Sequence, residues 1–259
     1  MKSIFTIFLF IFAVTVFSQP AKTIEYKALE GVDTDLLSLD LYPINDGKDH
    51  PVVIWVHGGA WAIGDKKNGM KDKVPFFNQL GYVFVSVNYR LSPMPVELNN
   101  DNRIRHPSHI EDVASAVSWI YGHIQEYGGN REKMVIMGHS AGAHLVALLA
   151  TNQKYLQQHG LNISIFSGVA PLDTEGFDVS RQVNRKGAMG RWYKNAFGDL
   201  KSDWVDASPA LQIEKGEKLP SHWLLVKRGS AERRKVVDEF AGILQKAGAS
   251  VSVVPALSL

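Results

Sequence analysis

Residues Gly138-His139-Ser140-Ala141-Gly142 form a G-x-S-x-G pentapeptide between two apolar segments. The apolar run 134–137 precedes it, and a run of small and apolar residues over 143–150 follows it. This order predicts a strand, a sharp turn and a helix, with a strained serine backbone that lifts the hydroxyl above the edge of a sheet. Glycines suit such a turn because strand and helix pass too close there for a Cβ atom. We therefore predict that Ser140 is a nucleophile.

A second glycine motif, His57-Gly58-Gly59-Ala60-Trp61, directly follows the apolar run 52–56. Two residues without side chains at the end of a buried strand leave backbone N–H groups able to point at an anion. Hydrolases use such donors to stabilise a tetrahedral oxyanion, an effect of about 3–4 kcal/mol per donor. Alone, the motif would be read as an ordinary glycine turn. Together with the serine turn downstream, it predicts an oxyanion hole.

Several short motifs of the chain resemble the esterase/lipase branch of the α/β-hydrolase superfamily. They are HGGAW, Gly64-Asp65-Lys66-Lys67, the stretch Asn88 to Pro93, and GHSAGAHL. The chain looks most like the carboxylesterase and kynurenine-formamidase-like members, from about residue 25 to its C-terminus. The resemblance implies that Gly59, Ala60 and Ala141 donate their backbone N–H groups to the oxyanion. It also implies an acid after the seventh strand and a histidine after the eighth.

The alternation of apolar runs with longer amphipathic segments predicts a mostly parallel sheet with helices on both faces. Residues 23–42 are expected to form antiparallel edge strands. The segment 174–219 is less regular and is expected to cap the active site, with aromatic residues that either line a pocket or pack the cap. Buried strands are expected over 52–56, 82–87, 134–138, 163–170, 223–227 and 251–254, and helices over 70–80, 109–127, 141–151 and 232–246.

Composition narrows the class of protein. A chain of 259 residues with 45% hydrophobic content is suited to one α/β domain with a substantial core. Its 28 basic and 26 acidic residues are interspersed and give a net charge of +2, which argues against nucleic acid as a partner. There is no cysteine, and therefore no disulfide, no catalytic thiol and no cysteine for lipid attachment.

The N-terminus has the pattern of a secretory signal. One positive charge in Met1-Lys2-Ser3 is followed by an apolar stretch over 4–17 and by small residues near Ser18. We predict a signal peptide over 1–18 and a mature domain over 19–259 that begins at Gln19. An uncleaved membrane anchor is the alternative, although this stretch is shorter than the ~20 residues that span a bilayer. The prediction is a secreted or periplasmic protein with no stable membrane insertion after cleavage.

Glu232 is the first candidate for the triad acid. It follows the predicted seventh strand and the turn Gly229-Ser230, where the superfamily usually has an acidic residue. A structural interpretation also exists, because the helix dipole and a serine N-cap favour an acidic residue in a first helical turn. Asp173, at the end of the preceding strand, and Asp238, further along the same helix, are the alternatives.

The chain departs from the family in its catalytic base, the histidine that the resemblance implies after the eighth strand. Only Pro255 to Leu259 follow the last strand, and all nine histidines lie at or before His222. His57, His139 and His144 are interpreted as structural, which leaves His106 and His109 as substitutes. We expect that the chain stops just before its histidine loop and last helix, and that loss of this helix exposes apolar surface.

The predicted function is a secreted serine hydrolase that cleaves a small acyl or aryl carboxylic ester through an acyl-enzyme. The substrate is a small molecule or an ester on a polysaccharide. This chemistry needs neither a metal nor an organic cofactor. An aryl-formamide hydrolase is the alternative among enzymes, because the same machinery cleaves activated amides. A non-catalytic binding or remnant protein is the alternative of another class, suggested by the missing histidine.

Overall fold

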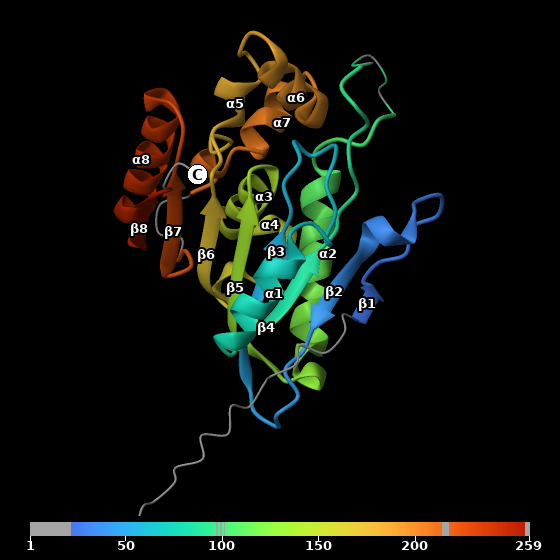
Figure 1. Ribbon diagram of the computed structural model, residues 1–259. Coiled ribbons are helices and arrows are strands. Elements are labelled where there is room, and N and C mark those ends of the chain that lie inside the picture. The colour runs from blue at the N-terminus through green and yellow to red at the C-terminus, as the bar shows by residue number, and fades with distance from the viewer. Residues whose placement is uncertain (1–21, 97, 99, 101, 214–217, 257–259) are drawn as a thin grey trace, which may run out of the picture.

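An eight-stranded sheet with the strand order β1-β2-β4-β3-β5-β6-β7-β8 forms the centre of the molecule (Figure 1). The computed structural model describes residues 22–96, 98, 100, 102–213 and 218–256, so the predicted signal over 1–18 lies outside the described residues. β1 (Lys22–Glu25) and β2 (Ser38–Tyr42) form the antiparallel edge, as predicted. The strands parallel to one another are β3 (His50–Val56), β4 (Val83–Val87), β5 (Gly129–His139), β6 (Phe166–Leu172), β7 (His222–Lys227) and β8 (Ser250–Pro255).

Runs of β-branched and aromatic residues form the central strands. Ile54 of β3 is paired with Val85 of β4 on one side and with Ile136 of β5 on the other, and it is fully buried. A strand that is covered on both faces has no polar alternation, which is why these runs are almost entirely apolar. Ser86 of β4 is buried as well, and its hydroxyl donates a hydrogen bond to the carbonyl of Lys66. The strands with the clearest apolar runs therefore lie at the centre of the sheet.

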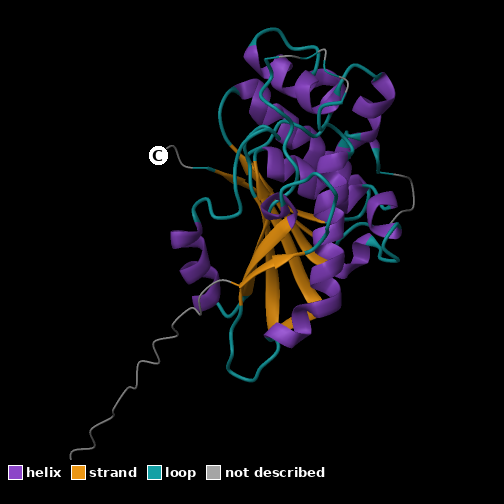
Figure 2. Cartoon of the chain, turned by 90° about the vertical axis from the view of Figure 1, so that its right-hand side faces the viewer, coloured by secondary structure: helices purple, strands orange, loops and turns teal. Residues whose placement is uncertain are grey.

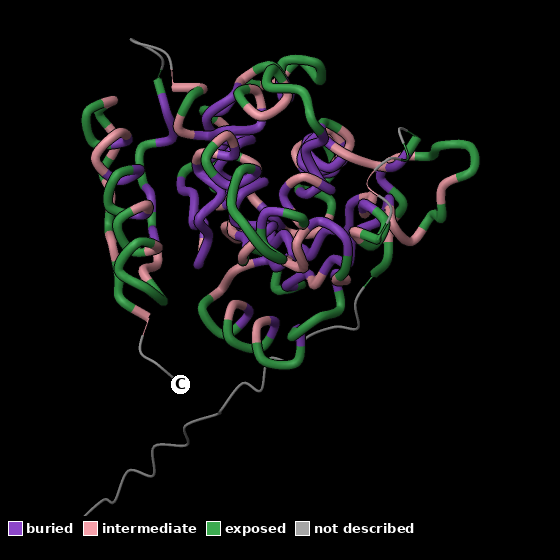
Figure 3. The backbone as a smooth tube through the Cα atoms, turned by 90° about the horizontal axis from the view of Figure 1, so that it is seen from above, coloured by how far each residue is buried: buried purple, intermediate pink, exposed green. Residues whose placement is uncertain are grey.

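Helices cover both faces, as predicted (Figure 2). α2 (Ser108–His123), α3 (Ala141–Thr151) and α8 (Ala231–Lys246) pack on one face over the main core. α1 (Met70–Gln79) covers the other face through a smaller cluster that includes Val53, Trp55 and Phe84. Seen from above, the buried segments gather in the middle of the molecule, while exposed ones form the rim and also cross in front of the middle (Figure 3).

Most predicted elements have somewhat different bounds in the structure, and the expected strand 134–138 already begins at Gly129. The expected strand 163–170 begins with a 3-10 turn over Ile163–Ile165, because the Asn162 side chain accepts a hydrogen bond from the N–H of Ser164. The expected helix 109–127 ends at His123 and continues as the 3-10 turn Ile124–Tyr127. At Asn162 a local polar group therefore shifted the start of the strand, whereas at His123 the backbone tightens into a 3-10 turn with no side-chain cap.

The segment after β6 lies beyond the carboxyl ends of β5 and β6 and contains α5 (Val179–Gln182), α6 (Ala188–Phe197) and α7 (Lys201–Asp206) (Figure 1). Asp206 of α7 connects this segment to the rest of the domain by hydrogen bonds. Its carboxylate accepts hydrogen bonds from His106 Nε2 at 2.8 Å and from the hydroxyl of Tyr155 at 2.6 Å. Tyr155 belongs to α4 (Lys154–Gln157). The segment is thus attached by a buried polar network as well as by apolar packing.

The α1 face of the sheet carries an open apolar groove of about 470 Å³ between α1 and β5 to β8. Phe76 and Leu80 of α1 are each 58% exposed beside it, and Leu224 of β7 is 36% exposed. Apolar surface is therefore open to solvent next to the last strands of the sheet. Among the described residues, no helix is both long and apolar enough to span a membrane.

Candidate active site

Ser140 joins the last residue of β5 to the first residue of α3 in a strained conformation. Its backbone has φ +54° and ψ −113°, a region that residues with a side chain rarely adopt. Its N–H donates to the carbonyl of Leu172 on β6 at 3.0 Å, and its carbonyl accepts from the N–H of His144 at 3.1 Å. Such strain persists only where the surroundings hold it. The predicted strand, turn and helix are present, and β6 and α3 together hold the turn.

Gly142 shows why the turn requires glycine. A Cβ atom at this position would lie 2.1 Å from the carbonyl oxygen of Val56 and 2.5 Å from that of His57. Both are backbone atoms at the end of β3, so no side-chain movement could relieve the contact. The nucleophile helix therefore packs directly on the strand that leads into the second glycine motif.

The loop over residues 57–63, called the oxyanion loop below, runs along Ser140. A Cβ atom on Gly58 would lie 3.2 Å from Ser140 Cβ. The N–H groups of Ala62 and Ile63 both donate to the carbonyl of Gly59, at 3.1 and 3.0 Å, and close a tight turn. The turn therefore occupies the N–H groups of Ala62 and Ile63, whereas those of Gly59 and Ala60 take no part in it.

The predicted oxyanion donors are the backbone N–H groups of Gly59, Ala60 and Ala141. Within the described part of the chain, those of Gly59 and Ala60 donate to no protein acceptor. Ala141 is the first residue of α3, and the first N–H groups of a helix have no partner inside it. The helix dipole also favours negative charge at this end. The surroundings of Ser140 therefore offer unsatisfied donors to an anion.

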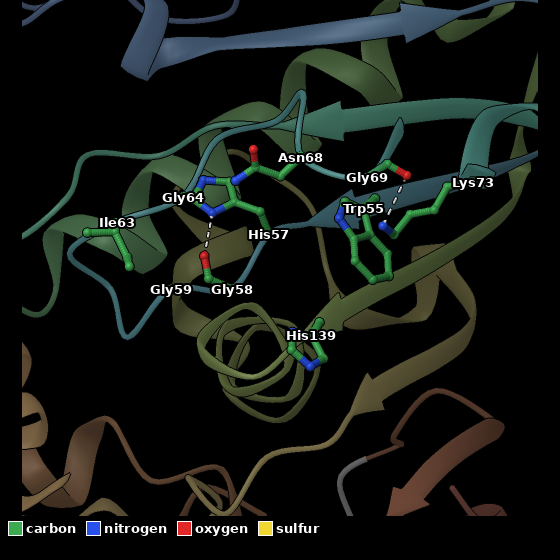
Figure 4. Close-up of a pocket in the computed structure, with 10 residues that line it drawn as sticks. All are labelled: Trp55, His57, Gly58, Gly59, Ile63, Gly64, Asn68, Gly69, Lys73 and His139. Carbon is green, nitrogen blue, oxygen red and sulfur yellow. Dashed lines mark hydrogen bonds between the residues drawn. The ribbon is translucent and has the colours of Figure 1, made fainter. Parts of the chain in front are cut away.

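A pocket of about 590 Å³ adjoins the oxyanion loop (Figure 4). Its lining includes Trp55 with the neighbouring Lys73 of α1, Ile63 and the glycines of the loop, and His139, which lies apart from the Lys73 side chain. The ammonium of Lys73 sits 4.8 Å from the centre of the Trp55 ring. The pocket thus has an apolar wall, formed by Trp55 and Ile63, and a cation, Lys73. His139, the residue that precedes Ser140, also lines it.

Asp173 lies directly after the residue whose carbonyl accepts the Ser140 N–H. It is buried and has φ +58°. Its carboxylate forms ion pairs with Arg228 Nε at 2.7 Å and with Arg233 at 2.8 Å, and it lies 3.8 Å from His139 Nε2. The structure therefore places one of the alternative acids beside the serine turn, with its charge balanced by two arginines.

Glu232, the first candidate acid, is exposed in the first turn of α8. Hydrogen bonds from its own backbone N–H and from the Ser230 hydroxyl lower the pKa of its carboxyl group. Asp238 is also exposed and forms an ion pair with Lys227. Both acids of α8 therefore face solvent, whereas Asp173 is buried next to His139, the residue before Ser140.

The two histidines considered as substitute bases are bound to other groups. His106 pairs with Asp206, and His109 Nε2 is 3.0 Å from the hydroxyl of Ser92. His109 is fully buried, and this burial lowers the pKa of its imidazole to about 3. Among the described residues, no histidine side chain is hydrogen-bonded to the Ser140 hydroxyl, and no cluster of three or more His, Asp or Glu side chains is arranged to hold a metal ion.

His57 and His144, interpreted as structural from the sequence, pack around the loop through partners that the sequence did not reveal. His57 Nδ1 hydrogen-bonds the carbonyl of Gly58 at 2.7 Å, and its ring stacks on Tyr89 at 4.5 Å. His144 bonds the indole of Trp61. Only their position within the two glycine motifs could have pointed to these contacts.

A mostly parallel sheet, a serine at positive φ between β5 and α3, and a glycine loop after β3 define the class as an α/β-hydrolase. The chain belongs to the BD-FAE family of α/β-hydrolase esterases, which it matches over residues 39–188.

Characterised relatives and solved structures agree with this class. The chain is 40% identical to esterase LipQ of Mycobacterium tuberculosis over 46% of its own length and 26% of that protein. It is 39% identical to the probable carboxylic ester hydrolase LipM of the same organism, over 39% of this chain and 21% of that one. The chain thus spans about a quarter of the length of these relatives.

The fold matches two solved esterases. Esterase B of Lactobacillus rhamnosis has a TM-score of 0.71 at 20% identity, with 92% of this chain and 76% of that one covered. Thermogutta terrifontis esterase 2, phosphonylated by sarin, has a TM-score of 0.71 at 22% identity, with 91% and 83% covered. At these identities the likeness establishes the fold.

Proposed function

We propose that this protein is a secreted serine hydrolase that cleaves a carboxylic ester with a small acyl or aryl group. The observation that carries the proposal is the left-handed backbone of Ser140, held next to a glycine loop with unsatisfied N–H groups. Relatives named as esterases support the same reaction.

In the proposed mechanism, Ser140 Oγ attacks the ester carbonyl as its proton passes to a general base. The oxyanion is stabilised by the N–H groups of Gly59, Ala60 and Ala141. The C–O bond to the alcohol then breaks, the base protonates the leaving alcohol, and an acyl-enzyme remains. Water, activated by the same base, hydrolyses this ester and returns the free serine.

We assign the general base to none of the described histidines, none of whose rings is hydrogen-bonded to the Ser140 hydroxyl. His109 and His144 are poor candidates, because burial lowers the pKa of each imidazole to about 3 and a base works best when its pKa is near the ambient pH. Both rings are also engaged with other groups.

For the acid, we propose Asp173 ahead of Glu232. Its carboxylate is buried beside the serine turn, while that of Glu232 is exposed to water. A buried anion orients and stabilises an imidazolium more strongly than a solvated one. Arg228 and Arg233 now balance this charge, and an imidazolium would share it.

Active-site labelling tests the nucleophile. A fluorophosphonate should label the full-length protein at Ser140, and Ser140→Ala should abolish the label. Turnover of nitrophenyl esters should fall by about 10⁶-fold, as when other triad nucleophiles are removed. The exposed Ser202→Ala is the control, and its activity should not change. A label on another serine would overturn the assignment, and faster turnover of an N-formyl arylamine would favour the formamidase alternative.

Mass spectrometry of the N-terminus tests secretion. Protein recovered from the periplasm or medium should begin at Gln19. An intact Met1 in the membrane fraction would instead support the anchored alternative.

A further inference from the structure

His144 is a fully buried imidazole, one helical turn after Ser140, with both ring nitrogens engaged. Its Nε2 lies 2.7 Å from the carbonyl oxygen of Ala207, and its Nδ1 lies 3.3 Å from the indole Nε1 of Trp61. A carbonyl only accepts and an indole N–H only donates. The ring is therefore neutral, with its proton on Nε2 and its lone pair on Nδ1. Burial maintains this state by lowering the pKa of His144 to about 3.

Trp61 is the strained residue of the oxyanion loop. Its φ is +60°, and that of the preceding Ala60 is +49°. Two consecutive non-glycine residues in the left-handed region are unfavourable and need support from their surroundings. The loop alone gives little, because it consists mainly of glycine and alanine.

The support for Trp61 comes from two other elements. Its indole is buried and makes edge contacts with the rings of His144, Tyr193 and Phe197, at centroid distances of 5.3, 4.9 and 4.8 Å. His144 belongs to the nucleophile helix α3, and the other two belong to α6. The indole is thus fixed between the nucleophile helix and the segment beyond the sheet.

His144 joins three parts of the molecule. Its backbone N–H donates to the carbonyl of Ser140. Its side chain accepts from Trp61 of the oxyanion loop and donates to Ala207, the residue after α7. A shift of α7 or of the loop would leave one of these buried groups without its partner.

We propose that His144 is a positioning residue. By fixing Trp61 against α6 and the end of α7, it holds the N–H groups of Gly59 and Ala60 in register with Ser140. This inference rests on the proposed ester hydrolysis and assigns a role within that site. It accounts for the tautomer of His144, for the position of Trp61 and for the left-handed pair Ala60–Trp61.

The expected effect falls on the chemical step. Oxyanion donors act mainly in the transition state, so their misplacement lowers kcat and leaves KM nearly unchanged. A misplacement of about 1 Å can cost about 10²-fold in rate. We therefore expect His144→Phe, which keeps an aromatic ring and removes both hydrogen bonds, to lower kcat by about 10–100-fold.

Two amide variants separate the two hydrogen bonds. In His144→Asn the amide oxygen of the shorter side chain would take the place of Nδ1, so this variant keeps an acceptor for Trp61. His144→Gln extends further and keeps a donor for Ala207. If the bond to Trp61 positions the loop, His144→Asn should restore most of the kcat lost in His144→Phe, while His144→Gln should not. Equal kcat in all three variants and wild type would overturn the proposal.

A second substitution tests the same contact from the other side. Trp61→Phe removes the indole donor and leaves His144 in place, so it remains informative if His144→Phe does not fold. The double variant should lose no more kcat than the larger single effect, because both substitutions remove one interaction. Fully additive losses would contradict the proposed coupling. Thr151→Val is the matched control, since it removes a buried side-chain hydrogen bond on the same helix far from Ser140.

Hydrogen exchange of the peptide 57–63 provides a readout that does not need turnover. Exchange should be faster in His144→Phe and Trp61→Phe than in Thr151→Val. Unchanged exchange, or faster exchange with unchanged kcat, would refute the positioning role. Wild-type protein that neither turns over esters nor reacts at Ser140 would instead refute the proposed function, so the two failures are distinguishable.

Discussion

The two flanks of Ser140 are built in different ways. On the oxyanion flank, backbone N–H groups are held by a tight turn and by the buried ring of Trp61. On the carboxylate flank, Asp173 meets long side chains from the ends of other elements, and Arg228 is 60% exposed. The first flank is rigid because backbone and buried rings form it. The second depends on side chains that reach across loops and can rearrange.

This difference has a consequence for substitution. Changes on the oxyanion flank disturb packed backbone, so activity and stability should fall together. Changes on the carboxylate flank remove charge from a polar region, so activity should fall with little loss of stability. The predictions below test this contrast.

The largest effect is expected for the buried acid. In the full-length enzyme, Asp173→Asn should lower kcat by about 10³–10⁴-fold, because the imidazole would lose the anion that orients it. Glu232→Gln should cost less than about tenfold, since this carboxylate is exposed. Ester turnover measures both. The reverse result would restore Glu232 as the acid and make Asp173 a partner of the arginines.

On the oxyanion flank, Gly142→Ala should reduce both activity and stability. Its Cβ atom would lie 2.1 Å from the backbone oxygen of Val56, so α3 must move away from β3. We expect a loss of about 1–3 kcal/mol in the free energy of unfolding, typical of overpacking, and about 10²-fold in kcat. Urea unfolding and ester turnover measure the two losses.

Gly122→Ala is the matched control for Gly142→Ala. It lies in α2 with no atom within 4 Å of the added Cβ. It should raise stability by about 0.5–1 kcal/mol, because alanine favours helix more than glycine does. Equal behaviour of the two variants would mean that the close approach of α3 to β3 is not required.

Acid should destabilise the protein through two buried histidines, His109 and His144. The folded-state pKa values of His109 and His144 are about 3, below the unfolded value of about 6.5. The unfolded state therefore binds more protons as the pH falls from about 6.5 towards 3, and stability falls with it. Each histidine contributes up to about 1.4 kcal/mol per pH unit in this window.

Urea unfolding at several pH values tests this dependence. His109→Phe should remove the contribution of one histidine and make the slope of stability against pH shallower between about pH 6 and 4. A slope equal to that of wild type would show that His109 titrates alike in the folded and unfolded states.

The smallest effect is expected for Asp238, the third candidate acid. Its ion pair with Lys227 is at the surface, with 52% of the aspartate side chain exposed. Asp238→Asn should change the free energy of unfolding by less than about 1 kcal/mol and leave kcat within about twofold. A large loss of kcat with unchanged stability would place the acid on α8.

Much of the fold could be predicted from the sequence because its signals are local. The runs around Ile54 and Val85 are apolar except for Ser86, as expected for strands buried on both faces. The helix after Ser140 begins and ends where the pattern predicted it, at Ala141 and Thr151. Element ends next to capping side chains, as at Asn162, were less predictable because one hydrogen bond decides them.

The residues of the candidate site also differ in whether the sequence could predict them. Ser140 and its glycines were predictable because strand, turn and helix are contiguous, and contact between consecutive elements leaves a pattern within a few residues. The charge environment of Asp173 was not predictable. Its partners Arg228 and Arg233 are more than 50 positions away in the chain, and no spacing rule connects them.

The sequence by itself determined that this chain is an α/β-hydrolase with a serine turn and a glycine loop, because backbone strain and close approach restrict which residues can occupy those positions. Only the tertiary structure decided that Glu232 faces solvent, that Asp173 lies buried beside the serine turn, and that His144 joins Trp61 to Ala207. Burial and hydrogen-bond partners depend on how distant segments pack, and the order of residues along the chain does not record them.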